Sequence, residues 1–241
     1  MTLHLSESDV AGLLSPADAV EAVEGCFRRL AAGSVENRPR YRLRLDHGAL
    51  AVMAAADLEL GYAGAKVYAG FQDGARFVVL LFRTDAPELA AVIDADKLGQ
   101  LRTGAASGVA ARHLARSGAA SLGLIGCGWQ AESQLACIRA ALPSLERAVA
   151  YCRTPERLRD FCERTGAEPG ESPRDAGECD VVVTVTGSPD PVLRGEWLRP
   201  GALVCAVGAN DPDKRELDNV VLERASFVCV DSRADAELES G

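Results

Sequence analysis

The sequence predicts a two-domain α/β protein, with a smaller α+β domain over residues 1–118 and a parallel sheet wrapped by helices over residues 119–241. In the first half, runs of strand length follow one helix. In the second half, apolar runs of strand length alternate with helix-length connections, the pattern typical of a parallel sheet. The 241 residues, 48% apolar and 25% charged, are enough to form packed cores.

The charge balance and the cysteines exclude several classes of protein. A formal net charge of −9 argues against nonspecific binding to nucleic acid, which needs clustered Lys and Arg. The longest uncharged stretch, Ser117–Ala131, is too short to span a bilayer, and the first residues lack a signal-peptide pattern. The eight cysteines form no C-x-x-C pair and the three histidines lie far apart in the sequence. We therefore expect a cytoplasmic protein with reduced thiols, most of them packed as small core residues, no metal, and neither nucleic acid nor membrane as partner.

The first half begins with a helix and continues as a mostly antiparallel sheet. Ser15 can cap a helix that starts at Pro16, Asp18 favours the positive end of that helix, and Gly33 can end it. An Asp-His-Gly turn signal at 46–48 predicts a hairpin. The strand candidates are Tyr41–Leu45, Ala49–Ala54, Tyr62–Tyr68, Phe77–Phe82 and Leu89–Ile93.

The stretch Ala95–Ala115 predicts a helix built from unusually small residues. Gly99, Gly104 and Gly108 each cost up to about 1 kcal/mol relative to Ala inside a helix, so they call for a reason. Close packing between helices is one reason, and close approach of a ligand is the other. Arg102 is the long cation in the middle of this stretch.

The second half predicts strands and helices in alternation after a domain boundary near Ala119. A short apolar run ends at Gly126 and precedes a helix candidate at Gln130–Ala141. Further strand-length runs are Arg147–Cys152, Asp180–Val185, Ala202–Val207 and Phe227–Val230, with connections that include Pro155–Thr165 and Asp213–Arg224.

The segment Gly126–Ala131 has the pattern G-x-G-x-x-A between a strand candidate and a helix candidate. In that context Gly126 makes the tight turn and Gly128 lets the backbone approach a pyrophosphate. Ala131 allows close packing, and the helix N-terminus stabilises the phosphates. The motif, its context and the alternation after it together predict a dinucleotide site.

The end of the next strand candidate indicates which dinucleotide binds. Sites that prefer NAD usually place an acid there to bind the ribose 2′-hydroxyl. This strand ends with Arg153 and Thr154 instead, and a guanidinium can pair with a 2′-phosphate. We therefore expect NADP(H), with NAD(H) as the alternative if Arg153 only faces solvent.

Several stretches together resemble the ornithine cyclodeaminase/mu-crystallin family. The matching stretches are Leu101–Ser107, Gly123–Ala131, Val182–Thr186, Gly195–Gly201, Ala206–Asp218 and Val230–Ser232. This resemblance implies a Rossmann dinucleotide-binding domain at 119–241, a substrate-binding and dimerisation domain at 1–118, and a homodimer. Members include cyclodeaminases, alanine dehydrogenases, ketimine or imine reductases, and lens crystallins.

The resemblance also implies individual roles. Arg40, with Arg42 as the alternative, and Arg102 would bind a substrate carboxylate, and Lys66 would be the catalytic cation. Surface charge is the competing interpretation for Arg40, Arg42 and Lys66. The predicted cofactor-binding set is Thr103, Gly126, Cys127, Gly128, Trp129, Gln130, Ala131, Arg153, Thr154, Thr184, Thr186 and Val207.

The sequence departs from the family at two places. Ornithine-type cyclodeaminases carry an Asp where this chain has Asn210, with Asp211 next to it. An amide cannot accept the proton, so Asn210 weakens the cyclisation hypothesis and Asp211 is the candidate replacement. The chain also ends at Gly241 where members continue, so we expect the first domain to be incomplete without a C-terminal segment.

These observations predict an NAD(P)-dependent oxidoreductase acting on a small amino, imino or keto acid. Reduction of a C=N bond is the first hypothesis. An ammonia-releasing amino-acid cyclodeaminase is the second, and a non-catalytic NADP-binding protein is the third.

Overall fold

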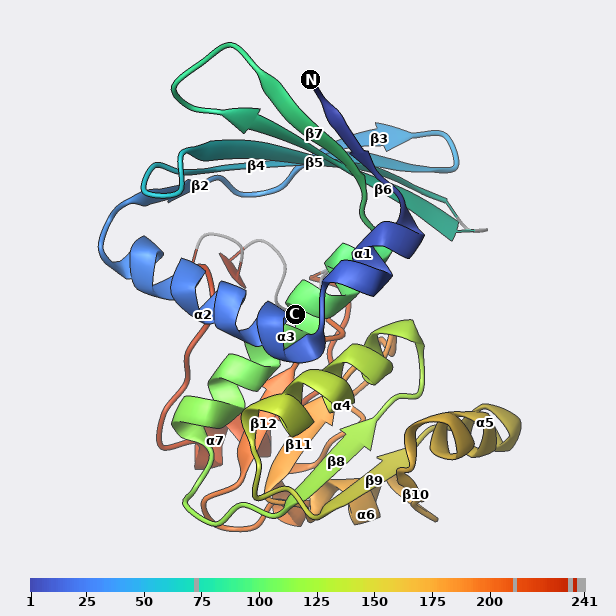
Figure 1. Cartoon of the computed structure of the whole chain (residues 1–241). Helices are drawn as coiled ribbons and strands as arrows, with labels where there is room; N and C mark the ends of the chain where they lie inside the picture. The colour runs from blue at the N-terminus through green and yellow to red at the C-terminus, as the bar shows by residue number, and fades with distance from the viewer. Residues whose placement is uncertain (72–73, 210–211, 234–235, 238–241) are drawn as a thin grey trace. The chain divides into compact units, whose positions relative to one another are not determined.

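The computed structural model describes residues 1–71, 74–209, 212–233 and 236–237 (Figure 1). Two compact units divide the chain, the first from Met1 to Arg102 and the second from Thr103 to Gly241. The predicted α/β class is confirmed, with one sheet in each unit. The division lies inside α3 (Asp96–Leu114), earlier in the chain than the boundary expected near Ala119.

The first unit contains a seven-stranded sheet in the order β1-β7-β6-β5-β4-β2, with β3 paired to β4. Its strands are β1 (Leu3–Leu5), β2 (Val35–Asn37), β3 (Tyr41–Leu45), β4 (Gly48–Asp57), β5 (Tyr62–Phe71), β6 (Gly74–Arg83) and β7 (Leu89–Asp94). β1 is parallel to β7, and the other pairings are antiparallel. All five strands expected in this half are present, and β4, β5 and β6 are longer than expected.

Capping explains where the helices of the first unit begin. In α2 (Pro16–Ala31) the Ser15 hydroxyl accepts the Asp18 N–H at 3.2 Å, and the Ser15 N–H donates to the Asp18 carboxylate at 3.3 Å. The helix α1 (Glu7–Leu13) was not expected, and its Glu7 carboxylate accepts the backbone N–H groups of Asp96 and Lys97 at 2.7 and 2.8 Å. Glu7 therefore supplies the cap of α3. Burial and the charge of Glu7 raise the pKa of Asp96.

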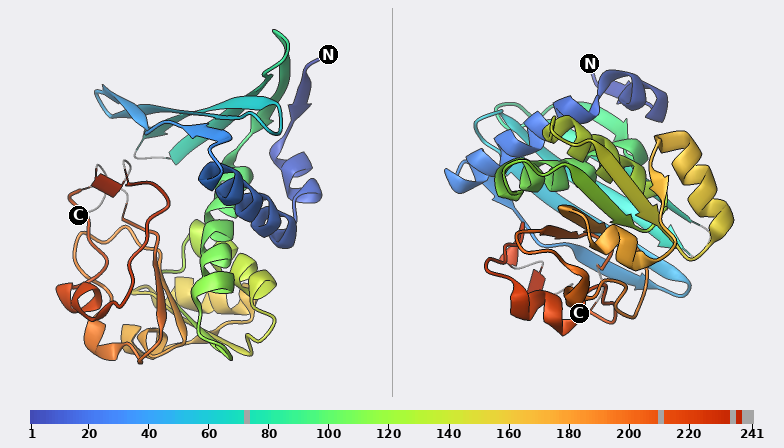
Figure 2. Two further views of the ribbon diagram at one scale, coloured as in Figure 1. Left: turned by 90° about the vertical axis from the view of Figure 1, so that its left-hand side faces the viewer. Right: turned by 90° about the horizontal axis from the view of Figure 1, so that it is seen from below.

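The two faces of this sheet differ in how far helices of the first unit cover them. On one face, which we call the outer face, lie Tyr41, Leu43, Leu45, Phe71 and Phe82, with exposed fractions of 63%, 44%, 44%, 51% and 41%. Within the first unit, α1 and α2 lie on the opposite side of the sheet in both views (Figures 1 and 2). The outer face is thus an apolar surface that no described element of its own unit covers.

The second unit is a parallel sheet with the strand order β10-β9-β8-β11-β12. The strands are β8 (Ser121–Ile125), β9 (Arg147–Tyr151), β10 (Glu168–Pro169), β11 (Val181–Thr184) and β12 (Leu203–Ala206). The helices are α4 (Trp129–Ala141), α5 (Pro155–Thr165), α6 (Pro173–Gly177), the 3-10 helix η1 (Gly195–Trp197) and α7 (Asn219–Arg224). The expected alternation of strands and helices is confirmed as far as β12.

Alternate residues of the buried strands contribute to two separate cores. On one face Leu124 packs in a cluster with Ile138 of α4 and Phe161 of α5. On the other face Val182 packs in a cluster with Leu193 and other residues of the α6 side. These strands are therefore covered on both faces, as expected for a parallel sheet between helices.

Close packing accounts for one of the helix glycines. A Cβ at Gly104 would lie 2.3 Å from the carbonyl oxygen of Ser133, so α3 and α4 approach each other too closely for any side chain there. Gly99 differs, because a Cβ there would meet nothing within 4 Å. Helix packing thus explains Gly104 but not Gly99.

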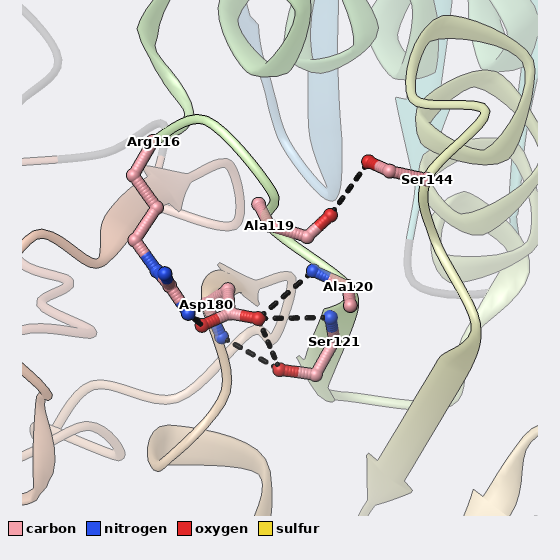
Figure 3. A network of polar contacts seen from close by, with 6 residues as sticks. All are labelled: Arg116, Ala119, Ala120, Ser121, Ser144 and Asp180. Atoms are coloured by element: carbon pink, nitrogen blue, oxygen red, sulfur yellow. Dashed lines mark hydrogen bonds and ion pairs between the residues drawn. The ribbon is translucent and has the colours of Figure 1, made fainter.

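A buried carboxylate joins the starts of two strands of the second unit (Figure 3). The Asp180 carboxylate accepts hydrogen bonds from the N–H groups of Ala120 and Ser121 at 2.9 and 3.1 Å, and from Arg116 at 3.1 Å. Burial opposes ionisation, but these hydrogen bonds hold the pKa of Asp180 well below its usual range. These hydrogen bonds connect the residues just after α3 with the beginnings of β8 and β11.

The expected strand at Phe227–Val230 is wrong. These residues form no strand, and Phe227, Val228 and Val230 are 68%, 62% and 50% exposed. An apolar run becomes a strand only where a neighbour pairs with it, and among the described residues nothing pairs with the outer edge of β12. Within the connection 213–224, the helix α7 covers Asn219–Arg224.

No helix among the described residues is long and apolar enough to cross a membrane. The same residues contain no group of three or more side chains able to hold a metal ion.

Candidate active site

A cavity of about 290 Å³ lies within the first unit. It brings together two of the predicted catalytic cations, Lys66 from β5 and Arg102 from α3. The other lining residues are Asn37, Met53, Ala54, Ala55, Gly64, Val79, Ala95, Leu98 and Gly99. Among the described residues no carboxylate lines this cavity, so the charged groups of its lining are both positive.

The sheet register explains the position of Lys66. Lys66 pairs with Met53 on β4 and Val79 on β6, so the three side chains share one face, and all three line the cavity. The Lys66 ammonium lies 5.4 Å from the ring centre of Tyr68 and 5.7 Å from that of Phe77. Those rings stack at 4.7 Å. The aromatic pair holds the ammonium beside the cavity by cation–π attraction.

Arg40 and Arg42 lie near the Tyr68 ring but do not line the cavity. The Arg40 guanidinium carbon is 5.9 Å from the ring centre of Tyr68, the same ring that Lys66 contacts. Arg42 pairs with Ala51, which pairs with Tyr68, so Arg42 projects from the same face and is exposed. Arg40 is therefore the one of these two arginines that shares the Tyr68 ring with Lys66.

Two features of the cavity were not found from the sequence. Asn37 contributes an amide from β2, a three-residue strand too short to show periodicity. Gly99 lines the cavity next to Leu98, and its missing side chain leaves space there. The ligand explanation offered for the helix glycines therefore fits Gly99.

The phosphate-loop geometry fits a dinucleotide. Gly126 has φ +119°, and a Cβ there would lie 2.5 Å from the carbonyl oxygen of Val185, so only glycine fits. Gly128 is the cap residue of α4 and makes no side-chain cap, and a Cβ there would meet nothing within 4 Å. Ala131 is fully buried against the sheet. The start of α4 thus faces open space, the arrangement in which helix N–H groups bind phosphate.

The remaining loop residues occupy different environments. Trp129 is 55% exposed, whereas the Oε1 atom of Gln130 is buried. Cys127 is half-buried, and burial together with the thiol of Cys152 raises its pKa well above the usual range. At the end of β9, Arg153 and Thr154 are exposed, and Thr154 makes no side-chain cap for α5.

A buried carboxylate that the sequence analysis did not single out organises the ends of β11 and β12. Glu216, 2% exposed, accepts hydrogen bonds from the Thr184 hydroxyl at 3.0 Å and the Thr186 hydroxyl at 2.7 Å. It also accepts the N–H groups of Thr186 at 2.6 Å and Gly208 at 2.7 Å. The Thr184 hydroxyl is thus fully buried and bonded to Glu216, so this side chain faces away from solvent.

The other predicted residues are placed as follows. Val207 donates its N–H to the Thr184 carbonyl at 2.9 Å, and Thr103 is half-buried on α3. Asn210 and Asp211 lie outside the described residues.

Comparisons with known proteins identify the family. The profile of the ornithine cyclodeaminase/mu-crystallin family matches residues 2–241. The chain belongs to this family. Over 241 residues this family member is 37% identical to alanine dehydrogenase of Archaeoglobus fulgidus, covering 95% of this chain and 74% of that protein.

Solved structures agree with this family member in fold. An archaeal alanine dehydrogenase dimer with bound NAD has a TM-score of 0.92 at 34% identity, covering 99% of this chain and 77% of that one. The Δ(1)-pyrroline-2-carboxylate reductase of Thermococcus litoralis, in complex with NADH and L-proline, has a TM-score of 0.91 at 29% identity. That match covers 99% of this chain and 78% of the reductase.

Proposed function

We propose that the chain is an NAD(P)-dependent oxidoreductase that reduces a small α-imino or α-keto acid, with a C=N bond as the preferred target. The observation that carries the proposal is the cavity of the first unit, whose two charged lining residues, Lys66 and Arg102, are both cations. Such a cavity favours a carboxylate ligand and gives it a proton donor. The phosphate loop of the second unit supports a dinucleotide as the second ligand.

Each cation has a distinct role in this proposal. Arg102 binds the substrate carboxylate through its planar guanidinium group, and Arg40, which lies directly before β3 and contacts the Tyr68 ring beside Lys66, assists. Lys66 donates a hydrogen bond, and then a proton, to the nitrogen or oxygen of the reacting double bond. When bound, the nicotinamide supplies the hydride for the carbon of that bond.

The residues that line the cavity also indicate which kind of side chain the substrate carries. Ala95, Gly64 and Gly99 are small, and Met53 and Val79 are apolar. The lining residues that the structure describes include no acid to pair with a second ammonium group, which disfavours a diamino acid. We therefore infer a substrate with a short, uncharged side chain.

The cofactor preference we propose is NADP(H). The support is Arg153, exposed at the end of β9 where sites that prefer NAD carry an acid. NAD(H) is the alternative, and the archaeal alanine dehydrogenase and the pyrroline-carboxylate reductase described above are relatives with bound NAD and NADH.

We also propose that the chain forms a homodimer through the outer face of the first unit. Tyr41, Leu43 and Leu45 of β3 and Phe71 of β5 expose large apolar side chains on that face. An exposed apolar patch of this kind favours association. The related archaeal alanine dehydrogenase is described as a dimer.

The test is a panel of cyclic imines, and of keto acids with ammonia, followed by NADPH and NADH absorbance. Oxidation of the cofactor with an imino acid is the expected result. Ammonia release from a diamino acid without net cofactor turnover would instead identify a cyclodeaminase, and dinucleotide binding without any turnover would identify a binding protein.

A further inference from the structure

Three cysteines from three segments of the second unit gather beside the phosphate loop. Cys127 lies in the loop, Cys152 directly follows β9, and Cys162 lies on α5. Cys127 and Cys162 pack against the same apolar cluster, and Cys152 lies close enough to Cys127 to help raise the pKa of its thiol. The proposed function gives the three thiol groups no role.

The register of β8 and β9 explains why Cys127 and Cys152 meet. Ile125 pairs with Tyr151, and the Gly126 N–H donates to the Tyr151 carbonyl at 2.8 Å. Cys152 and Cys127 are therefore the first residues beyond the last hydrogen bond between these strands. Adjacent strands run about 4.8 Å apart, so Cys152 lies beside Gly126, the residue directly before Cys127.

The environment of the pair also permits reaction. Both thiols are half-buried, so neither is sealed inside the core. The Cys152 thiol donates to the Thr154 carbonyl at 3.4 Å, which keeps it at the surface end of the strand. Small oxidants can reach a thiol in such a position.

We propose that Cys127 and Cys152 form a reversible disulfide that closes the dinucleotide site when a peroxide oxidises the protein. The proposal rests on the dinucleotide site proposed above, because its consequence is lost cofactor binding. A bound dinucleotide would in turn shield both thiols.

The chemistry needs one peroxide for each disulfide. The Cys152 sulfur attacks a peroxide oxygen, an S–O bond forms as the O–O bond breaks, and one water leaves after proton transfer. The Cys127 sulfur then attacks the Cys152 sulfur, so that an S–S bond replaces the S–O bond and a second water leaves. Two thiols lose two electrons and two protons, and the peroxide is reduced to two waters.

The disulfide would restrain the loop at the point where its backbone must approach the phosphates of the dinucleotide. Cys127 lies between Gly126 and Gly128, where the backbone must approach the phosphates, and Cys152 directly precedes Arg153. A covalent link between loop and strand end fixes both and fills the space between them with two sulfur atoms. Phosphate and ribose contacts are therefore lost together.

The experiment uses the full chain, reduced and then treated with hydrogen peroxide, with and without saturating NADPH. Peptide mapping by mass spectrometry under non-reducing conditions identifies the disulfide, and NADPH fluorescence measures affinity. We expect a Cys127–Cys152 link, a loss of affinity of about tenfold or more, recovery with dithiothreitol, and slower linkage with NADPH present.

Two variants sharpen the test. Cys152→Ser should bind NADPH normally when reduced and keep that affinity in peroxide, whereas the matched control Cys162→Ser should still lose it. A mapped Cys152–Cys162 link, or equal peroxide sensitivity in Cys152→Ser, would overturn the proposal. A reduced chain that binds neither dinucleotide would refute the proposed function and the closing of the site together. Binding by the reduced chain without a mapped disulfide would refute the redox proposal alone.

Discussion

Lys66 has its position because β5 runs through the middle of the first sheet. Its neighbours Met53 and Val79 fix the side on which it projects, and Tyr68 with Phe77 fixes its ammonium. A lysine whose charge is held by two aromatic rings beside a cavity is poorly explained as solvated surface charge. The site role implied by the family resemblance is thus compatible with the geometry.

The first prediction concerns this lysine. Lys66→Met should lower kcat by roughly 10²–10⁴-fold while leaving NADPH affinity within about twofold, because the proton donor is lost and the phosphate loop is untouched. Absorbance kinetics and a fluorescence titration measure the two effects separately. Lys66→Arg keeps the charge but should also be slow, since guanidinium does not release its proton. Normal rates in Lys66→Met would remove this residue from the mechanism.

The second prediction concerns Arg153. We expect NADPH to bind at least about tenfold more tightly than NADH, a difference of about 1.4 kcal/mol that one charge-assisted phosphate contact can supply. Arg153→Ala should abolish most of that preference. Arg159→Ala, which removes an exposed arginine further along α5, is the matched control and should leave it intact. Equal affinities for both cofactors in the parent chain would show that Arg153 does not bind a 2′-phosphate.

At the scale of elements, α3 carries two glycines with opposite constraints. Gly104→Ala places a Cβ 2.3 Å from the Ser133 carbonyl oxygen and should destabilise the protein. Overpacking of this kind costs about 1–3 kcal/mol. Gly99→Ala meets no atom within 4 Å and should stabilise the helix, by up to about 1 kcal/mol, while raising KM because the methyl group enters the cavity. Urea unfolding and steady-state kinetics test the pair, and a stabilised Gly104→Ala would contradict the packing argument.

The fourth prediction concerns the link between β8 and β11. Asp180→Asn should lower the free energy of unfolding by about 2 kcal/mol at pH 7, because the ionised carboxylate accepts hydrogen bonds from Arg116 and two backbone N–H groups. The folded state lowers the pKa of Asp180, so its contribution is complete above the unfolded pKa and is lost on acidification. The difference between parent and variant should therefore shrink below about pH 4. A difference that stays constant down to pH 2 would contradict this assignment.

The sequence was most informative where local signals are strong. The capping residues Ser15 and Asp18, the Gly loop before α4 and the apolar runs of the buried strands each predicted their element. β1 and β2 were not predicted, because strands of three residues show no periodicity, and the short helix α1 was missed although Ser6 and Asp9 form a capping box at its start. Phe227–Val230 has strand composition without a partner strand, and composition alone cannot reveal that.

The candidate site was predicted only in part, for a related reason. Lys66 and Arg102 were found, but Asn37 and Glu216 act through contacts that are distant in sequence. Glu216 reaches Thr184 and Thr186 from about thirty residues away, and no local pattern marks a carboxylate as buried.

At the scale of the whole molecule, the outer face of the first unit leads to the fifth prediction. Leu43→Lys should shift a homodimer toward monomer, because it places a charge in the middle of an apolar surface. Leu58→Lys is the matched control: Leu58 is 65% exposed, lies outside the strands and should leave the assembly unchanged. Sedimentation velocity measures both. Unchanged sedimentation of Leu43→Lys would place the interface elsewhere.

The pairing of β1 with β7 has a consequence for how the chain folds during synthesis. Residues 3–5 are synthesised long before their partners 91–93, and Glu7 can cap α3 only after Asp96 and Lys97 have been made. Contacts so far apart in sequence form late, because a long loop must close before they stabilise anything. The edge of β7 and the first turn of α3 therefore stay exposed on the nascent chain until the amino terminus returns to them. A bulky N-terminal fusion would prolong that interval, whereas the same fusion at the other terminus would not.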